Sequence, residues 1–329
     1  MPAFKLRSKG LTMQQISDCL EIPKSTVASW LVGISIPKPA TRLGRFEKGY
    51  LAGMVDAEGW LRVNKNRGRY THAFMAIANG HLQTLLSMQK QIGGRLIKRH
   101  AKDNWKDCYT LEITGRLREI LPQIRRMLIV KEAVCNLIFR FWEEGQQGRK
   151  GKHIDETELK RRREIFEKIE DLNDRGPTRK TLPTKTDFLL KKGLTKEEFG
   201  YVSAIIDGEG YIGTIRRGAS AVASMSITNC CFDLLSRVQA KIGGTIYTKS
   251  ASDRTRQTFV LVLRGENIRK ALCLIRPGLS VKKRQANLVL SLWNGDYGIN
   301  KSRWRTNDAE KIRRLNVHEQ LKVINCREV

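Results

Sequence analysis

Two glutamates, Glu58 and Glu209, occupy equivalent places in two closely similar segments of this 329-residue chain. The first segment reads GYLAGMVDAEGWL from Gly49, and the second reads GYVSAIIDGEGYI from Gly200. Each is a run of small and apolar residues that predicts a helix ending in Asp-x-Glu-Gly. Both glutamates are therefore expected at helix C-termini, where the helix dipole disfavours negative charge by roughly 0.3–1 kcal/mol.

Small residues recur one helical turn apart on each predicted helix, so the two helices could approach backbone to backbone. These residues are Gly53 and Ala57 in the first helix, and Ala204 and Gly208 in the second. Such a pair brings both glutamates to one end of an interface, where like charges need a cation to hold them. The pattern predicts a divalent-metal site there, and solvated surface glutamates are the alternative. Gly59 and Gly210 are expected to end the helices as C′ glycines.

The duplication extends well beyond the two motifs. MAIAN from Met75 returns as MSITN from Met225, and VKEAVCNLIFRFW from Val130 returns as VKKRQANLVLSLW from Val281. A repeat of this length is too large for a solenoid unit. It predicts two homologous half-domains related by a pseudo-two-fold axis through the helix pair.

Each half is predicted to fold as helix, two strands, helix, two strands and helix, an α+β arrangement of four-stranded sheets with helices on one face. In the first half the predicted elements are 47–58, 60–66, 71–78, 81–92, 95–100, 108–114, 116–127 and 131–143. A loop is expected from Gly145, then a charged helix from Asp155 with Leu159, Phe166 and Ile169 inside. The predicted divisions are 1–45, 46–174, a linker at 175–195 and 196–329, with Pro177 and Pro183 opposing regular structure in the linker.

The first 45 residues predict a small all-α helix-turn-helix unit, with GLTMQQISDCL as one helix and KSTVASWL as the second. Glu21 stands in the turn, where glycine is common. The predicted core is Leu11, Ile16, Leu20, Ile22, Val27, Trp30 and Leu31. The residues expected to face a DNA major groove are Lys24, Ser25, Thr26 and Ser29. A helical cap and a protein-interaction unit remain the alternatives.

LAGMVDAEG, from Leu51 to Gly59, and VSAIIDGEG, from Val202 to Gly210, resemble the two signature helices of single-chain LAGLIDADG homing endonucleases. The resemblance extends from about residue 46 to the end of the chain. The second motif begins Val-Ser-Ala where the family has Leu-Ala-Gly, and both carry Glu for the second Asp. Both departures keep the carboxylates.

The resemblance implies two αββαββα half-domains and a set of active-site residues. The implied metal ligands are Glu58 and Glu209, with the carbonyls of Ala57 and Gly208, for Mg²⁺ or another divalent cation such as Mn²⁺ or Ca²⁺. Lys131 and Lys282 match the lysine that stabilises transition-state charge, with surface solvation as the alternative. Asn79 and Asn229 match a solvent-positioning residue, although strand-end turns also favour asparagine. Asp56 and Asp207 match an acid whose role is mainly structural.

DNA contacts are expected from the sheets, because every second strand residue points to the same face. Arginine suits bidentate contact with guanine, and lysine mostly holds phosphates. The candidates in the first half are Arg62, Asn64, Lys65, Arg67 and Arg69. Those in the second half are Arg216, Arg217, Thr248, Lys249 and Arg254.

Composition independently indicates a nucleic-acid partner. The chain has 61 Lys and Arg against 33 Asp and Glu, a formal net charge of +28. So large an excess points to a polyanion. No apolar run is long enough for a membrane span, and no signal peptide is recognisable. Seven cysteines without a CxxC pair fit a reducing compartment, cytoplasm or organellar matrix, better than secretion.

These features together predict a monomeric, metal-dependent, site-specific endonuclease for double-stranded DNA that acts as a homing endonuclease in intron or intein mobility. Because the halves differ in sequence, the target should be long and asymmetric. The resemblance further implies cleavage across the minor groove, leaving short 3′ overhangs. The alternative is a relative that binds nucleic acid without cutting it, either an intron RNA maturase or a transcription regulator.

Overall fold

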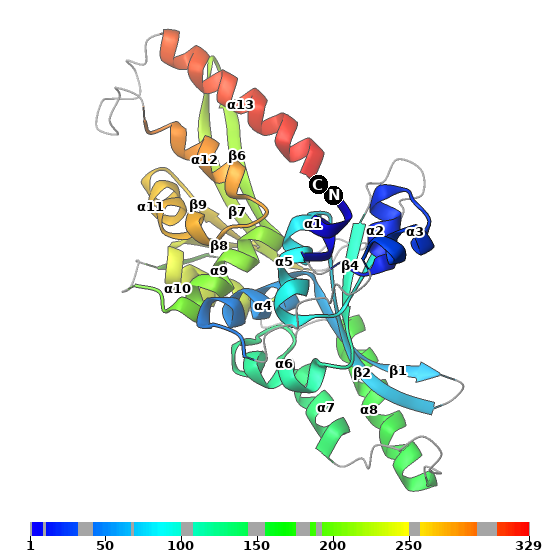
Figure 1. The fold of residues 1–329 in the computed structure, drawn as a ribbon. Helices are drawn as coiled ribbons and strands as arrows, with labels where there is room; N and C mark the ends of the chain where they lie inside the picture. Colours follow the sequence, from blue (N-terminus) through cyan, green and yellow to red (C-terminus); the bar gives the residue numbers. More distant parts are fainter. Residues whose placement is uncertain are drawn as a thin grey trace.

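The computed structural model describes residues 2–8, 11–31, 42–66, 69–99, 108–143, 155–175, 185–188, 193–249, 257–294 and 308–328. Two α+β halves meet through a central pair of helices (Figure 1), as the repeat predicts. Within these ranges, no helix combines the length and the apolar character needed to cross a membrane.

The central pair consists of α4 (Arg45–Glu58) and α9 (Lys196–Glu209), the helices of the two motifs. A methyl group at Gly53 would lie 2.6 Å from the Tyr201 carbonyl oxygen and 2.7 Å from the Ala204 Cβ. One at Gly208 would lie 2.6 Å from the Ala57 Cβ. The predicted contact between the small faces is confirmed, and it leaves no room for larger side chains.

The two helix ends differ from the prediction in one respect. Gly59 and Gly210 follow the last helical residues, but both have extended backbones, with φ of −97° and −82°. A left-handed C′ position is therefore absent at these two ends. Glycine is needed for space instead, because a Cβ at Gly59 would lie 2.6 Å from the Val55 Cα. The chain passes directly from each helix into a strand.

The two sheets have the same strand order and are antiparallel throughout. The first sheet runs in the order β1 (Gly59–Asn66), β2 (Arg69–Asn79), β4 (Cys108–Ile113) and β3 (Arg95–Arg99). The second contains β6 (Gly210–Arg217), β7 (Ser220–Asn229), β9 (Thr258–Leu263) and β8 (Gly244–Lys249) in the equivalent order. The α+β fold with two pseudo-symmetric halves is thereby confirmed.

A fifth strand, β5 (Lys185–Phe188), pairs with β8 at the outer edge of the second sheet. The prediction of a linker without regular structure is wrong for these four residues. The backbone of β5 pairs with the N–H and C=O groups of β8, which would otherwise be unpaired at the edge of the sheet. The predicted loop at 145–154 and the rest of the linker from 176 to 192 lie outside the described residues.

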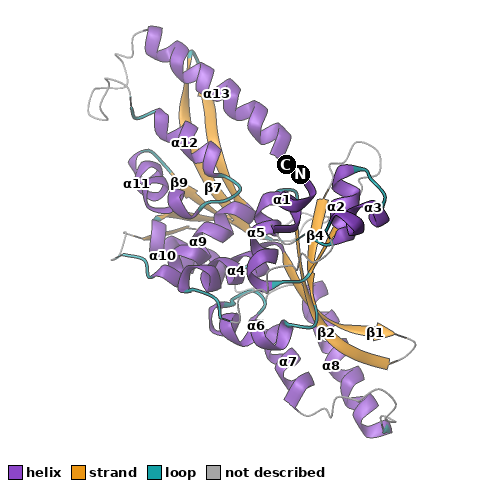
Figure 2. Ribbon diagram, viewed as in Figure 1, coloured by secondary structure: helices purple, strands orange, loops and turns teal. Residues whose placement is uncertain are grey.

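Helices cover one face of each sheet and enclose the core between sheet and helices (Figure 2). In the first half these are α5 (Leu82–Ile92), α6 (Leu117–Ile124), η1 (Arg125–Met127), α7 (Glu132–Glu143) and α8 (Glu156–Arg175). In the second half they are α10 (Phe232–Ile242), α11 (Glu266–Ile275), η2 (Arg276–Gly278), α12 (Lys283–Ser291) and α13 (Asp308–Glu328). The other face of each sheet is called its open face below.

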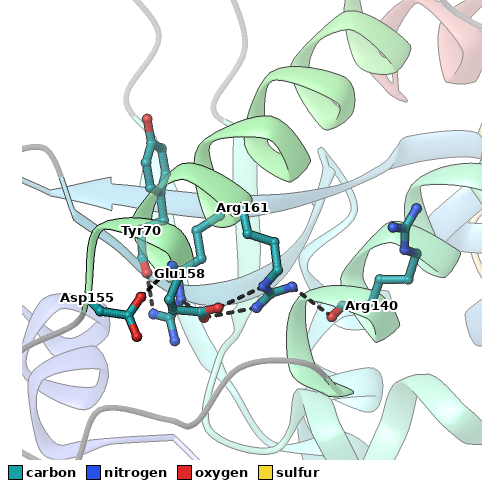
Figure 3. A network of polar contacts seen from close by, with 6 residues as sticks. Tyr70, Arg140, Asp155, Glu158 and Arg161 are labelled. Atoms are coloured by element: carbon teal, nitrogen blue, oxygen red, sulfur yellow. Dashed lines mark hydrogen bonds and ion pairs between the residues drawn. The ribbon is translucent and has the colours of Figure 1, made fainter.

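The last long helix of each half is anchored by the same ion-pair pattern, which extends the repeat beyond the segments recognised in the sequence. In α8, Glu158 pairs with Arg161 and Arg162, and Arg161 donates to the Arg140 carbonyl oxygen at 3.2 Å (Figure 3). In α13, Glu310 pairs with Arg313 and Arg314, and Arg313 donates to the Ser291 carbonyl oxygen at 2.9 Å. These helices run along the β1–β2 and β6–β7 hairpins (Figure 1).

The N-terminal unit contains α1 (Pro2–Ser8), α2 (Met13–Leu20) and α3 (Lys24–Trp30), of which α1 was not predicted. Glu21 joins α2 to α3 with φ of 54°, in the left-handed region that favours glycine. The unit packs on the first half, where Leu86 of α5 joins its buried cluster and Gln15 donates to the Leu96 carbonyl oxygen. Leu11, Ile16, Val27 and Leu31 are buried as predicted. Trp30 is 40% exposed, so its assignment to the core is wrong.

Replacing Gly53 by alanine should destabilise the whole protein, because its methyl group would collide with backbone and Cβ atoms of α9. We expect the free energy of unfolding in urea to fall by about 1–3 kcal/mol, as for other overpacked sites. Gly115→Ala is the control, since its Cβ would meet nothing within 4 Å, and should change stability by less than about 0.5 kcal/mol. Equal losses in both variants would contradict the close helix contact.

Candidate functional site

The C-termini of α4 and α9 bring Glu58 and Glu209 together at the end of the helix pair. A Cβ at Gly208 on α9 would lie 3.6 Å from the Glu58 Oε1 on α4. Burial raises the pKa of Glu58, and the nearby Lys282 opposes that rise. Burial and then the charge of Glu58 raise the pKa of Glu209 to about 7. The two carboxylates therefore form one electrostatic site, in which adding a cation would favour the ionised state of both.

Asp56 and Asp207 take no part in this carboxylate pair, because their side chains accept hydrogen bonds from backbone amides. Asp56 is 4% exposed and accepts hydrogen bonds from the amides of Ile129 and Lys131 at 2.7 and 2.9 Å. Asp207 is 2% exposed and accepts bonds from three consecutive amides. These are Ser280, Val281 and Lys282, at 2.7, 3.1 and 2.8 Å. The structural role implied for these two acids fits this geometry.

The same bonds fix the backbone of Lys131 and of Lys282 at the starts of α7 and α12. Lys282 lies beside the carboxylate pair, where its charge acts on both glutamates. The Lys282 Nζ donates to the carbonyl oxygens of Ile206, Asp207 and Gly208, at 3.0, 2.7 and 3.2 Å. Its ammonium thus neutralises the negative end of α9. Burial lowers the pKa of Lys131, and the charge of Asp56 opposes that effect. Lys282 therefore lies where it can meet an anion held near the glutamates, while Lys131 lies next to Asp56 in the other half.

Asn79 and Asn229 end β2 and β7 and make the same turn. The Asn79 side-chain oxygen accepts a bond from the His81 amide at 2.8 Å, and that of Asn229 accepts one from Cys231 at 2.8 Å. This supports the turn interpretation for both residues. Asn229 also donates from its Nδ2 to the Glu209 Oε1 at 3.3 Å, which places it at the carboxylate site.

The donors at this site suit a hard divalent cation. They are carboxylate oxygens and helix-end carbonyls, the ligand types that Mg²⁺ and Ca²⁺ prefer. The carbonyls of α9 already surround a cation, the Lys282 ammonium. Among the described residues no group of three or more acidic, histidine or cysteine side chains gathers at one point. A metal here would therefore depend on two glutamates, main-chain carbonyls and the oxygens of its substrate.

Strand pairing assigns the predicted DNA-contact residues to faces, because directly paired residues lie on the same side of a sheet. Arg62 alternates with the buried Leu61 and Val63, which places it on the open face with Asn64. At the edge of the sheet its guanidinium also lies 3.8 Å from Glu170 of α8. Arg217 and Lys249 lie on the open face of the second sheet, paired with Ser220 and Thr258.

Three of the predicted contact residues lie on the face of the sheet opposite to the other candidates. Lys65 follows the buried Leu61 and Val63 at every second position of β1, pairs with the buried Tyr70 and lies over its ring, 5.7 Å from the centroid. Arg216 pairs with the buried Ala221, and Thr248 with the buried Phe259. All three therefore lie on the helix-covered faces. Arg67, Arg254 and the Arg69 side chain lie outside the described residues.

Two aromatic and arginine pairs were missed on the open faces. The Arg99 guanidinium on β3 lies 6.0 Å from the ring centroid of Trp60 on β1. In the second half, that of Arg264 lies 5.8 Å from the ring centroid of Tyr247. Alternation in the predicted strand 95–100 would have placed Arg95 and Arg99 with the candidates. The Tyr247 contact depends on how β8 and β9 pair, which the sequence does not display.

Comparison with solved structures identifies the fold. I-AabMI, a LAGLIDADG meganuclease bound to uncleaved DNA, is 12% identical and aligns over 83% of this chain and 98% of its own, with a TM-score of 0.57. I-LtrWI, a LAGLIDADG homing endonuclease bound to target DNA, is 14% identical over 84% of this chain and 97% of its own, with a TM-score of 0.54. This is the LAGLIDADG fold.

I-SmaMI, another LAGLIDADG homing endonuclease, bound to cleaved DNA, is 15% identical over 78% of this chain and 90% of its own, with a TM-score of 0.53. No family model matches the sequence, and no curated protein matches it in a sequence comparison. At these identities the LAGLIDADG likeness concerns the fold alone.

The raised pKa of Glu209 predicts how stability should depend on pH without metal. Between its ordinary pKa of 4.5 and about 7, the folded protein holds a proton that the unfolded chain releases. Stability therefore falls as pH rises through this range. Glu209→Gln removes the titrating group, so in chelator we expect the variant to exceed the wild type by about 1–3 kcal/mol at pH 8.

At pH 4.5 the two proteins should be nearly equal in urea unfolding. The control is Glu167→Gln, which alters an exposed glutamate on α8. A difference between Glu209→Gln and wild type that is the same at every pH would show that Glu209 titrates normally.

Proposed function

We propose that this protein is a monomeric, metal-dependent endonuclease that cuts double-stranded DNA at a long, asymmetric site. The observation that carries the proposal is the meeting of Glu58 and Glu209 at the end of the helix pair, with the charge of Lys282 acting on both. A protein that only binds an anionic duplex gains nothing from two carboxylates directed at it. The DNA-bound structures of I-AabMI and I-LtrWI support the same function.

The chemistry follows from the groups at the helix ends. Glu58 and Glu209 would hold divalent metal, with the carbonyls of Ala57 and Gly208 as further ligands, and the metal when bound would activate water and offset phosphate charge. Lys131 and Lys282 would stabilise the charge that develops on the phosphate oxygens. Asn229, already bonded to Glu209, would orient solvent, and Asn79 would do so in the other half.

DNA would lie along the open faces of the two sheets, one half-site on each. Arg62, Asn64 and Arg99 would read the first half-site, and Arg217, Lys249 and Arg264 the second. Arginines stacked on Trp60 and Tyr247 present their donors in a fixed plane, which suits bidentate contact with guanine. Since these two sets differ, the target should lack two-fold symmetry. A role in intron or intein mobility is part of the proposal.

Glu58→Gln and Glu209→Gln should each abolish double-strand cleavage. We expect at least about 100-fold slower cutting, the scale of removing one transition-state stabilising group. DNA affinity should stay equal or improve, because each change removes a negative charge that faces phosphate. The test is to select cut sites from a randomised duplex library with Mg²⁺, then to measure binding and cutting on the selected site.

Glu167→Gln on α8 is the matched control and should cut at the wild-type rate. If both active-site variants cut as fast as the wild type, the carboxylates are misassigned. If the wild-type protein cuts no duplex and prefers structured intron RNA at matched salt, a maturase is indicated. Binding to one DNA site without cutting would indicate a transcription regulator.

The exposed face of α3 provides a separate test of the N-terminal unit, which we propose adds DNA contacts at one end of the site. Lys24, Ser25 and Ser29 are exposed, and Thr26 is half-buried. Lys24→Ala with Ser29→Ala should shorten the protected footprint at one end only and weaken binding by about tenfold or more, with the same phosphates cut. Gln14→Ala, on the exposed face of α2, is the control. An unchanged footprint would make the unit a cap on α5.

A further inference from the structure

Two tyrosine hydroxyls cross the boundary between the halves. Tyr50 on α4 donates to the Asp207 Oδ2 on α9 at 2.8 Å, and Tyr201 on α9 donates to the Asp56 Oδ2 on α4 at 2.7 Å. Both rings are 8% exposed and both aspartates are buried more deeply. The two bonds are related by the pseudo-two-fold axis, so the arrangement occurs twice in one molecule.

Each of these aspartates also carries the loop that presents a lysine in its own half. Asp207 accepts bonds from Ser280, Val281 and Lys282, and Asp56 from Ile129 and Lys131. The tyrosine hydroxyl is thus the only side-chain donor that these carboxylates receive from the opposite helix among the described residues. The chain of contacts runs from the tyrosine of one half to the lysine of the other.

We infer that Tyr50 and Tyr201 are positioning residues that act across the molecule, with Tyr50 fixing Lys282 and Tyr201 fixing Lys131. The inference deepens the proposed function, since it states how one half governs the chemistry of the other. The terminal torsion of a carboxylate has only a broad preference, so its partners decide its orientation. Each carboxylate holds loop amides through both oxygens, and the tyrosine adds the bond from the opposite helix to the Oδ2, the oxygen that accepts the first of these amides.

The tyrosines suit this role because they stay protonated. Burial and the adjacent aspartate raise the pKa of Tyr50 and of Tyr201 well above the ordinary value. Each hydroxyl therefore remains a donor at any pH at which the protein would act. Phenylalanine preserves the buried ring and removes the hydroxyl, which makes it the informative substitution. At Tyr201 this removes the bond to Asp56, and at Tyr50 it also removes the contacts with the Ser280 and Thr84 hydroxyls.

The first experiment measures lysine reactivity in the DNA-free protein, so it does not depend on nuclease activity. Amines are labelled with a limiting acylating reagent, and the modification of Lys131 and Lys282 is compared by mass spectrometry. Tyr50→Phe should raise the labelling rate of Lys282 several-fold and leave Lys131 unchanged, and Tyr201→Phe should do the reverse. Tyr70→Phe is the control, a buried tyrosine in the β1–β2 hairpin, and should change neither.

The second experiment follows nicking of each DNA strand on the selected site. Lys131→Met and Lys282→Met define which strand each lysine serves. Tyr50→Phe should then show the strand bias of Lys282→Met, with roughly tenfold slower cutting of that strand, and Tyr201→Phe that of Lys131→Met.

Equal labelling changes at both lysines, or none, would overturn the inference. So would a strand bias that follows the lysine of the tyrosine's own half. If the wild-type protein cuts no DNA, the proposed function fails while the labelling result still decides the tyrosine roles.

Discussion

The contact between the backbones of α4 and α9 is the constraint on which the rest of the structure depends. The helices approach each other through small residues, Gly53 and Ala57 on α4 and Ala204 and Gly208 on α9. The space between them is so narrow that a methyl group on either glycine would collide with the opposite helix. Because Gly208 faces Ala57, the two helices also end at the same level, and both terminal glutamates share one site. The same closeness lets a tyrosine on each helix reach an aspartate on the other. A wider pair would lose both arrangements together.

Close packing has an electrostatic cost, which the structure offsets with hydrogen bonds to backbone. Asp56 and Asp207 are almost fully buried, and an unpaired carboxylate there would be strongly unfavourable. Each is instead surrounded by amides of the loop that precedes α7 or α12 and by a tyrosine hydroxyl. The loops are ordered by the same bonds. Asp56 and Asp207 therefore connect the packing of α4 against α9 to the positions of Lys131 and Lys282. A change in the helix packing would also move the lysine-bearing loops.

Much of this could be predicted from one sequence because the repeat supplies two versions of every element. All eight elements predicted for the first half are present, and the small residues at helical spacing correctly indicated the close pair. Choosing every basic residue near a predicted strand could not separate the two faces of the sheet. Lys65 follows the buried Leu61 and Val63 at every second position, and Arg216 pairs with the buried Ala221, so both lie on the covered faces. Trp30 is spaced along the helix as a core residue would be, but its side chain is 40% exposed and lies outside the core of the N-terminal unit. Tyr50 and Tyr201 occupy equivalent positions in the two repeated segments, but their partners are 157 and 145 residues away in the sequence, so the sequence alone did not reveal these bonds.

The two halves repeat each other closely at the interface between them and less closely on the outer faces of their sheets. The aspartate, tyrosine and loop bonds repeat in both halves, as do the ion pairs that anchor α8 and α13. The residues above the sheets repeat only in kind: Trp60 and Arg99 correspond to Tyr211 and Lys249 in the second half. The arginine–aromatic contacts differ, since Arg99 lies over Trp60 in one half and Arg264 over Tyr247 in the other. The two lysines also differ. The Lys282 ammonium donates to three carbonyl oxygens, whereas burial lowers the pKa of Lys131. A duplicated frame of this kind fixes the side chains at its centre and leaves the two outer faces free to differ.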